Sequence, residues 1–230
     1  MEKLGILGGM GPESTLDYYK KIVYQYENRK HAQVFPNINI ESIDIFPMLA
    51  LCHQKKYSEL TEMLTEGINN LYRAGATVGL MAANTPHIVF DSVQKHSPIP
   101  LISIVEATLE RVKHNKQASV GLLGTELTMT QDFFKKPFQD AGIKIVLPER
   151  PEISKVNKFI VTELEQGILK SSTKEYLIRI VNRMISTDHV AGIILGCTEI
   201  PLILSQQDFS IPVYDTTQIH VDKAVDYLLK

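Results

Sequence analysis

The strongest constraint on this chain is an internal repeat, because its two halves carry matching blocks in the same order. Four pairs of blocks correspond: residues 5–8 with 121–124, 15–21 with 130–136, 79–87 with 193–201, and 99–103 with 211–215. The repeat spans about half of the chain, which is too long a period for a solenoid. Any two β–α–β segments share some apolar pattern, but agreement in both order and spacing favours two similar lobes.

The two copies differ at one chemically decisive position. The first copy reads Gly79-Leu-Met-Ala-Ala83-Asn-Thr-Pro-His87, and the second reads Ile193-Ile-Leu-Gly-Cys197-Thr-Glu-Ile-Pro201. When the copies are aligned on their apolar strands, Ala83 stands where Cys197 stands. The two copies therefore carry a thiol and a methyl group at equivalent positions.

Short β-branched runs alternate with longer helical patterns along the chain. Strands are expected at residues 3–7, 38–44, 77–82, 101–104, 119–123, 143–147, 192–195 and 213–214. Helices are expected at residues 13–28, 55–74, 87–95, 106–112, 130–141, 155–166, 174–187 and 218–229. Strands that are apolar throughout predict parallel sheets flanked by helices, so the fold class is α/β. We expect two pseudosymmetric lobes, formed by residues 1–99 with 212–230 and by residues 100–211.

Composition excludes several classes of protein. The 230 residues carry a net charge of -2 without a basic stripe, which argues against nucleic-acid binding. Two cysteines, Cys52 and Cys197, make neither a disulfide framework nor a zinc motif, so no metal is expected and a reducing cytoplasm fits best. The first residues turn polar too soon for a signal peptide, and no apolar run is long enough to enter a membrane.

Small and polar residues follow the predicted strands. Ligands of doubly wound sheets bind beyond the carboxyl ends of the strands, which predicts a ligand site in a cleft between the lobes. The turn that begins at Gly8 lacks both the dinucleotide fingerprint and the phosphate-loop lysine. We therefore expect mostly turn geometry there, with some backbone N–H groups open to a small anion, and Met10 lining the cleft.

Several side chains with hydroxyl or amide groups are candidates for holding a carboxylate: Asn84, Thr85, Thr125, Thr128 and Thr198. Many donors with few formal charges, close to helix N-termini, suit a small carboxylate. Each residue would serve equally well as a helix cap, and only the convergence of several favours binding.

Cys197 is the candidate reactive group. It follows an apolar strand and precedes a predicted helix, where a thiol is shifted toward the thiolate, which acts as a base or a nucleophile. The alternative is a buried, inert cysteine. Glu199 is a candidate for orienting a proton path or for favouring a helix start, and His87 is either a proton relay or a structural hydrogen-bonding group. Cys52 is expected only to pack.

With these residues in place, the chain resembles the aspartate/glutamate racemase superfamily of cofactor-independent amino-acid racemases. The start Gly8-Gly-Met-Gly-Pro-Glu13 looks most like the aspartate racemase branch. The resemblance covers nearly the whole chain and rests on residues 5–13, 83–87, 121–125, 128–129 and 196–200. It implies catalysis without pyridoxal phosphate, a small amino-acid or dicarboxylate ligand, and a homodimer. It also implies two residues that remove and return the Cα proton on opposite faces of the substrate.

In the usual member of that family both proton-transfer residues are cysteines. Cys197 matches one of them, and Ala83 occupies the position of the other. Ala83 is either engineered, or natural with a proton from Thr85, His87 or water, or a sign that the reaction needs one base, as in the related arylmalonate decarboxylase. We favour a natural one-cysteine racemase-like enzyme, because residues 82–87 form a coherent motif. The alternatives are a one-base lyase or decarboxylase, and an inactive protein that binds a small carboxylate.

The side chain of the substrate is open at this point. The resemblance implies a cation near the distal carboxylate of an acidic substrate, yet neither residues 44–52 nor residues 163–166 contain lysine or arginine. Aspartate is our first expectation, by the resemblance alone, and a neutral or basic side chain is the alternative.

Overall fold

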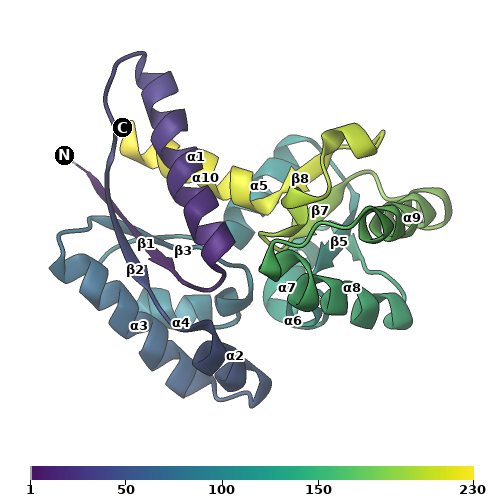
Figure 1. The fold of residues 1–230 in the computed structure, drawn as a ribbon, viewed down its shortest axis with the longest axis horizontal. Coiled ribbons are helices and arrows are strands. Elements are labelled where there is room, and N and C mark those ends of the chain that lie inside the picture. The colour runs from purple at the N-terminus through teal and green to yellow at the C-terminus, as the bar shows by residue number, and fades with distance from the viewer. Residues whose placement is uncertain (1) are drawn as a thin grey trace. The chain divides into compact units, whose positions relative to one another are not determined.

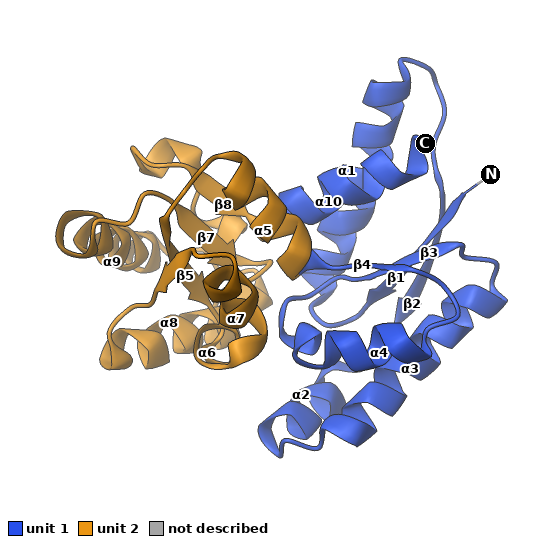
Figure 2. Ribbon diagram, turned by 180° about the vertical axis from the view of Figure 1, so that it is seen from behind, with its two compact units in different colours: residues 1–104, 217–230 blue, residues 105–216 orange. Residues whose placement is uncertain are grey.

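The computed structural model describes residues 2–230 and divides them into two compact α/β units (Figure 1). The first unit runs to Ile104 and also includes residues 217–230, and the second comprises residues 105–216 (Figure 2). Each unit therefore holds one copy of the repeat, together with a helix contributed by the other half of the chain.

Each unit is built on a four-stranded sheet in which every neighbouring pair is parallel. The first sheet has the order β2-β1-β3-β4 and the second the order β6-β5-β7-β8, so corresponding strands occupy corresponding places. The strands are β1 (Lys3–Gly8), β2 (Asn37–Ser42), β3 (Val78–Met81), β4 (Leu101–Ile102), β5 (Ser119–Gly124), β6 (Lys144–Val146), β7 (Ile193–Gly196) and β8 (Val213–Asp215). The repeat and the α/β fold class are confirmed.

The register of the strands repeats as well. Gly5 is paired with Gly79 in the first sheet, and Gly121 is paired with Ile193 in the second. These pairs agree with the alignment of the two sequence copies. Because Ala83 lies as far beyond Gly79 as Cys197 lies beyond Ile193, the two residues hold equivalent positions in their units.

The α-helices agree with the predicted ones except at two places, where the sequence predicts no helix. The first unit has α1 (Pro12–Lys30), α2 (Ile45–His53), α3 (Tyr57–Arg73), η1 (Thr85–Val89), α4 (Phe90–His96) and α10 (Thr216–Leu228). The second has α5 (Ile104–His114), α6 (Glu126–Thr130), α7 (Asp132–Asp140), α8 (Arg150–Thr162), η2 (Leu164–Gln166), α9 (Ser171–Asp188), η3 (Ile200–Leu202) and η4 (Gln206–Asp208). The unpredicted α-helices are α2 and α6, and the short 3₁₀ helices η3 and η4 were not predicted either. No helix formed by residues 2–230 is long and apolar enough to cross a membrane.

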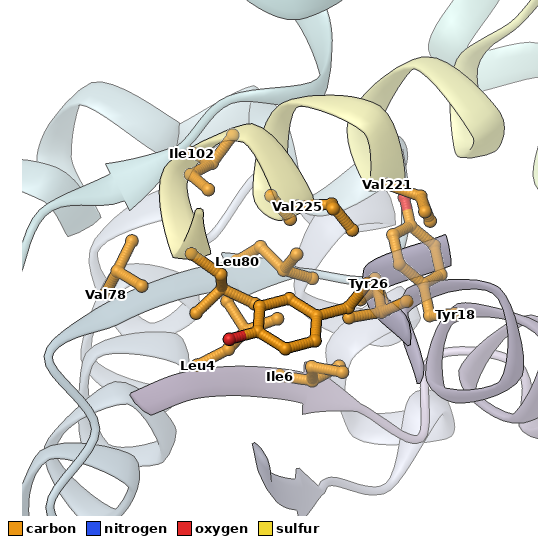
Figure 3. Close-up of a cluster of buried hydrophobic side chains, with 13 residues drawn as sticks. Leu4, Ile6, Tyr18, Tyr26, Val78, Leu80, Ile102, Val221 and Val225 are labelled. Atoms are coloured by element: carbon orange, nitrogen blue, oxygen red, sulfur yellow. The ribbon is translucent and has the colours of Figure 1, made fainter. Parts of the chain in front are cut away.

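Helices cover both faces of the first sheet. On one face, side chains of β1 and β3 such as Ile6 and Leu80 join Tyr18 and Ile22 of α1 and Val225 of α10 in one buried cluster (Figure 3). On the other face, α3 packs so closely that a Cβ atom added at Gly5 would lie 3.0 Å from the Cβ of Leu71. Successive residues of a strand point to opposite faces, so the central strands are apolar throughout.

The two compact units divide the chain a few residues later than the predicted lobe boundaries, so that each edge strand stays with its sheet. β4 pairs with β3 and thus belongs to the first unit, while β8 pairs with β7 and belongs to the second. The chain changes unit after each of these strands, at Ile104 and at Thr216, rather than after Ile99 and Ile211. Helix α5 is therefore carried into the second unit and α10 into the first (Figure 2).

Candidate functional site

The predicted site residues are divided between the units and lie in or just beyond the strand ends. Met10, Ala83, Asn84, Thr85 and His87 belong to the first unit, and Thr125, Thr128, Cys197, Thr198 and Glu199 belong to the second.

In the second unit, three consecutive residues after β7 form a hydrogen-bonded group. The Cys197 Sγ donates to Glu199 Oε2 over 3.0 Å, and Thr198 Oγ1 donates to the same oxygen over 2.8 Å. All three side chains are buried. One carboxylate oxygen thus accepts hydrogen bonds from both the thiol and the hydroxyl group. This contact makes Glu199 the group to which the thiol proton can be transferred.

The expectation that a helix N-terminus shifts Cys197 toward the thiolate is wrong. The chain continues only into η3, a three-residue 3₁₀ helix at Ile200–Leu202, which is too short to supply a sizeable dipole. Burial is the largest effect on this thiol and raises its pKa well above the ordinary value, and the charge of Glu199 raises it further. The thiol therefore carries its proton at neutral pH.

Thr125 and Thr128 lie at the end of the neighbouring strand β5. Thr125 caps α6 by accepting from the backbone N–H of Thr128 over 3.3 Å, and the two hydroxyl oxygens are 3.0 Å apart. Thr128 is fully buried against Gly124 and Gly196. Of the two threonines, only Thr125 keeps part of its surface accessible.

A second carboxylate, which the sequence does not mark as a site residue, also acts on this group. Glu165 lies in η2, and its charge contributes to the raised pKa of the Cys197 thiol. Burial and the charge of Glu199 raise the pKa of Glu165 to about 7. No sequence motif marks this residue.

In the first unit the glycine-rich turn is closed by its own side chains. The N–H of Gly9 donates to Thr15 Oγ1 over 3.0 Å, and that hydroxyl donates to the carbonyl of Gly11 over 2.9 Å. Gly9 has a positive φ of 80°, and a Cβ there would lie 2.2 Å from the carbonyl oxygen of Ile43. Turn geometry therefore accounts for this glycine, and its N–H is not open to an anion. Met10 is buried in the same turn.

His87 is held between two backbone groups. Its Nδ1 donates to the carbonyl of Ala83 over 2.9 Å, and its Nε2 accepts from the N–H of Ile104 over 3.3 Å. Burial, aided by the nearby His220, lowers the pKa of His87 to about 3. Because the ring is neutral and both of its nitrogens are hydrogen-bonded, the structural role for His87 is favoured over the proton relay.

His220 of α10 completes a buried histidine pair that sequence reasoning missed. Its Nε2 donates to the carbonyl of Ile102 over 2.9 Å, and its Nδ1 accepts from the hydroxyl of Tyr18 over 2.9 Å. The ring centroids of His87 and His220 are 6.2 Å apart. Burial lowers the pKa of His220 to about 4. A single histidine in an amphipathic helix gives no signal of such a contact.

Ala83 and its neighbours form a buried segment just beyond the end of β3 in the first unit. Ala83, Asn84 and Thr85 are each less than a tenth exposed, and Asn84 precedes η1 without a side-chain capping bond. Ser14 donates to the carbonyl of Ala82 over 3.3 Å, which ties the glycine-rich turn to the end of β3. The methyl group of Ala83 is thus buried at the position in the first unit that is equivalent to that of the Cys197 thiol in the second.

One surface cavity of the first unit, about 550 Å³ in volume, lies along α3 and α4 and contains none of the predicted residues. Among residues 2–230 there is no group of three or more histidine, cysteine or acidic side chains arranged to hold a metal ion.

Comparisons with known proteins agree on one family. The model of the family described as Asp/Glu/Hydantoin racemase matches residues 7–224. The broad specificity amino-acid racemase RacX of Bacillus subtilis is 24% identical over 217 residues, which cover 93% of this chain and 92% of that protein. A solved aspartate racemase homologue from Pyrococcus horikoshii is 36% identical with a TM-score of 0.87, and covers 100% of both chains. A structure from Yersinia pestis, described as a candidate Asp/Glu racemase, is 33% identical with a TM-score of 0.91 and the same coverage.

Proposed function

This chain belongs to the Asp/Glu/hydantoin racemase family, and we propose that it is a cofactor-independent amino-acid racemase in which Cys197 exchanges the Cα proton of the substrate. The observation that carries the proposal is the 3.0 Å contact from the Cys197 thiol to the Glu199 carboxylate, at the carboxyl end of β7. A thiol with a buried carboxylate beside it can lose its proton to that carboxylate and regain it.

The proposed reaction begins with the protonated thiol. Glu199 takes the thiol proton, and the resulting thiolate removes the Cα proton, which leaves a carbanion on the substrate and a neutral thiol on Cys197. The Cys197 thiol then returns a proton to Cα, and Glu199 returns its proton to the thiolate, which restores both groups. Deuterium enters Cα when the thiol or carboxyl proton exchanges with D₂O before this return. In this scheme Thr125 offers its hydroxyl group to the α-carboxylate and Thr198 holds the Glu199 carboxylate, with Asn84 and Thr85 in the corresponding positions of the first unit.

Ala83 limits what this scheme can achieve. A methyl group neither accepts nor donates a proton, so only one of the two equivalent positions carries an ionisable group. We propose that exchange by Cys197 is efficient on one face of Cα, and that inversion relies on a slower proton source such as water. This imbalance predicts exchange that is faster than racemisation.

A one-base lyase is the second candidate function. A decarboxylase that protonates a carbanion on one face needs a thiol that carries its proton at rest, and burial keeps the Cys197 thiol in that form. We rank it second because the named relatives are a racemase and an aspartate racemase homologue.

We also propose that the protein is a homodimer and that it works in a reducing cytoplasm. Both cysteines are free, which fits that compartment.

The decisive test follows deuterium and chirality together. Single enantiomers of amino acids are incubated with the protein in D₂O, and Cα deuterium and the fraction of the opposite enantiomer are measured over time. Deuterium with inversion supports a racemase, and deuterium with retention supports a single working base. Binding of an amino acid without exchange would contradict the proposal and leave an inactive carboxylate-binding protein. Release of CO₂ from a malonate would favour the lyase.

A further inference from the structure

Among residues 2–230, β2 is the longest strand at the edge of a sheet. The edges of the two sheets are β2, β4, β6 and β8. Strand β2 has six residues, whereas β4 has two and β6 and β8 have three each. Proteins protect sheet edges with short strands or with lysine, and β6, which holds the place of β2 in the second unit, begins with the exposed Lys144. Strand β2 contains no lysine, so its edge has neither protection.

The backbone of β2 presents hydrogen-bonding groups on its outer side. Neighbouring residues of a strand direct their N–H and C=O groups to opposite sides. Just after β2, the N–H of Ile43 donates to the carbonyl of Gly8 in β1 over 3.0 Å. The odd-numbered residues of β2 therefore face β1, while Ile38, Ile40 and Ser42 direct their backbone groups outward. Since β1 is the one strand that neighbours β2 in the sheet, these outward groups have no strand partner.

The most exposed apolar side chain of β2 lies on the face of the sheet that α1 covers. Ile38 packs against the cluster that contains Tyr18 and Tyr26 of α1 (Figure 3). Ile40, two residues further along the strand, points to the same face. It is 43% exposed, so α1 leaves this end of the edge uncovered.

The flank of α1 above this edge is apolar as well. One flank of α1 faces α10, because Gln25 donates to Asp222, and α10 in turn lies toward β4, where His220 is bonded. Leu16 and Tyr19 lie on the other flank, toward β2, and both are exposed. An apolar strip on the helix thus continues the apolar edge of the strand.

Five exposed side chains at or beside this edge form what we call the edge patch: Leu16, Tyr19, Val34, Phe35 and Ile40. Val34 and Phe35 belong to the segment that leads into β2. At about 200 Å² for a free large side chain, the exposed fractions of the patch amount to roughly 500 Å² of apolar surface. A dimer of standard size buries about 800 Å² on each partner, so the patch and the backbone of β2 supply most of what a stable dimer needs.

We propose that the edge of β2 is the dimer interface, where it pairs in antiparallel fashion with β2 of a second copy of this chain. This inference rests on the proposed homodimer and names its surface. A two-fold axis through the strand edge makes the edge its own partner, because each outward N–H meets an outward carbonyl of the second copy. The edge patches of the two copies then pack together on one face of the joined sheets.

Backbone groups and charge select the register of this pairing. In an antiparallel pair centred on Ile40, every outward backbone group of β2 gains a partner, and Glu41 faces Asn39 of the second copy. A pair centred on Asn39 brings in Pro36, which has no N–H to donate. A pair centred on Glu41 places two carboxylates opposite each other, which is unfavourable. The register centred on Ile40 avoids both defects.

Sedimentation velocity over a range of protein concentrations tests the surface. The dissociation constant of the dimer is measured for the natural protein, for Ile40→Lys, for Tyr19→Lys, and for Tyr24→Lys as the matched control. Tyr24 is 54% exposed, close to the 47% of Tyr19, but lies five residues on and so about 140° around α1. Circular dichroism checks that each variant is folded, and Tyr19→Lys changes only an exposed helix position.

We expect Ile40→Lys and Tyr19→Lys to raise the dissociation constant by about 30-fold or more, because the two-fold axis places two lysines in each interface. Tyr24→Lys should leave it within about threefold. If Tyr19→Lys raises it no more than Tyr24→Lys does, the edge of β2 is not the interface.

Disulfide formation tests the register. Asn39→Cys and Glu41→Cys are each made in a Cys52→Ser background and oxidised alone or as a mixture. In the proposed register these two positions face each other with Cα atoms about 4.5 Å apart, which is within disulfide range. We expect a linked dimer from the mixture and none from either variant alone. A linked dimer from one variant alone would overturn the register.

The homodimer and its surface can fail separately. A natural protein that is monomeric at the highest concentration measured would contradict both. A dimer that resists both Ile40→Lys and Tyr19→Lys would leave the homodimer standing and overturn β2 as its interface. Catalysis by Cys197 is tested independently, by deuterium exchange.

Discussion

The Glu199 carboxylate has two opposing effects on the Cys197 thiol. Its negative charge raises the pKa of the thiol, which makes ionisation harder. At 3.0 Å from Sγ it is also the group that can receive the proton when ionisation occurs. A glutamine at this position separates the two effects, because an amide has nearly the same shape but no charge and little affinity for a proton.

In Glu199→Gln we expect the pKa of the Cys197 thiol to fall while the rate of Cα proton exchange also falls, by about 100-fold. The thiol pKa is measured from the pH dependence of the ¹³Cβ shift of labelled cysteine, in a Cys52→Ser background. Cys52 is buried beside Met48, and burial raises its pKa to about 11, so its removal leaves one cysteine signal. An unchanged thiol pKa would show that Glu199 does not govern this thiol.

Ala83→Cys places a thiol at the position equivalent to Cys197. Because acid–base catalysis contributes about 100-fold or more, we expect a clear gain in racemisation relative to exchange. Ala83→Ser is the matched control, since a hydroxyl of similar size is a far weaker acid. The two rates are read from deuterium content and enantiomer ratio in the same samples. Equal effects of cysteine and serine would show that size, and not proton transfer, limits this position.

At the scale of elements, the exchange of helices between the units makes α10 part of the core of the first unit. Val225 of α10 is fully buried in the cluster with Leu4, Ile6 and Leu80 (Figure 3). Although residues 217–230 lie far from β1 in the sequence, they cover its face. The stability of the first unit should therefore depend on the C-terminal end of the chain.

Val225→Ala should lower the free energy of unfolding by about 2 kcal/mol, because it leaves a cavity in a fully packed cluster. Lys20→Ala, on the exposed side of α1, should change it by less than about 0.5 kcal/mol. Both values come from urea unfolding followed by circular dichroism. A loss at Val225 no larger than that at Lys20 would mean that α10 contributes little to the packing of the first unit.

The elements that sequence reasoning found are those with a clear period and a matching copy. All eight strands were predicted from their short β-branched runs, and six of them lie in blocks that recur in both halves. Helix α2 was missed because residues 45–51 are apolar without a helical period and include a proline, while its start depends on Asp44 capping Phe46. Helix α6 is a five-residue turn capped by Thr125, too short to give a periodic signal.

The candidate site was predicted in its residues more fully than in its chemistry. Cys197, Thr198 and Glu199 were identified from one motif, and the structure joins them through a single oxygen. The direction of the thiol pKa was wrong, because burial and the charge of Glu199 raise it and the three-residue helix η3 is too short to lower it. Glu165 and His220 act through contacts between segments far apart in the chain, and one sequence gives no measure of such contacts.

For the molecule as a whole, the two buried histidines predict loss of stability in acid. The folded pKa values of His87, about 3, and His220, about 4, lie below the ordinary 6.5, so the unfolded chain binds more protons between these limits. Their stabilisation is complete above pH 6.5 and is lost as the pH falls, by about 1.4 kcal/mol per pH unit for each histidine. Glu165 has a raised pKa in the folded protein, so its own contribution to stability increases as the pH falls.

The contribution of one histidine is isolated by comparing the natural protein with His220→Gln, since glutamine can still donate to Ile102 and accept from Tyr18. Between about pH 6 and pH 4.5, the slope of unfolding free energy against pH should be smaller in the variant by about 1.4 kcal/mol per unit. Chemical unfolding at a series of pH values gives both slopes. Identical slopes would mean that His220 is not held in its neutral form.

The central claim is that the thiol of Cys197 moves the Cα proton, and one measurement tests it directly. The rate of Cα deuterium incorporation in D₂O is determined for the natural protein, for Cys197→Ser and for Cys52→Ser, with the best substrate of the amino-acid panel. We predict that Cys197→Ser lowers the rate by about 100-fold or more and that Cys52→Ser leaves it nearly unchanged. Exchange that persists at the natural rate in Cys197→Ser would contradict the account.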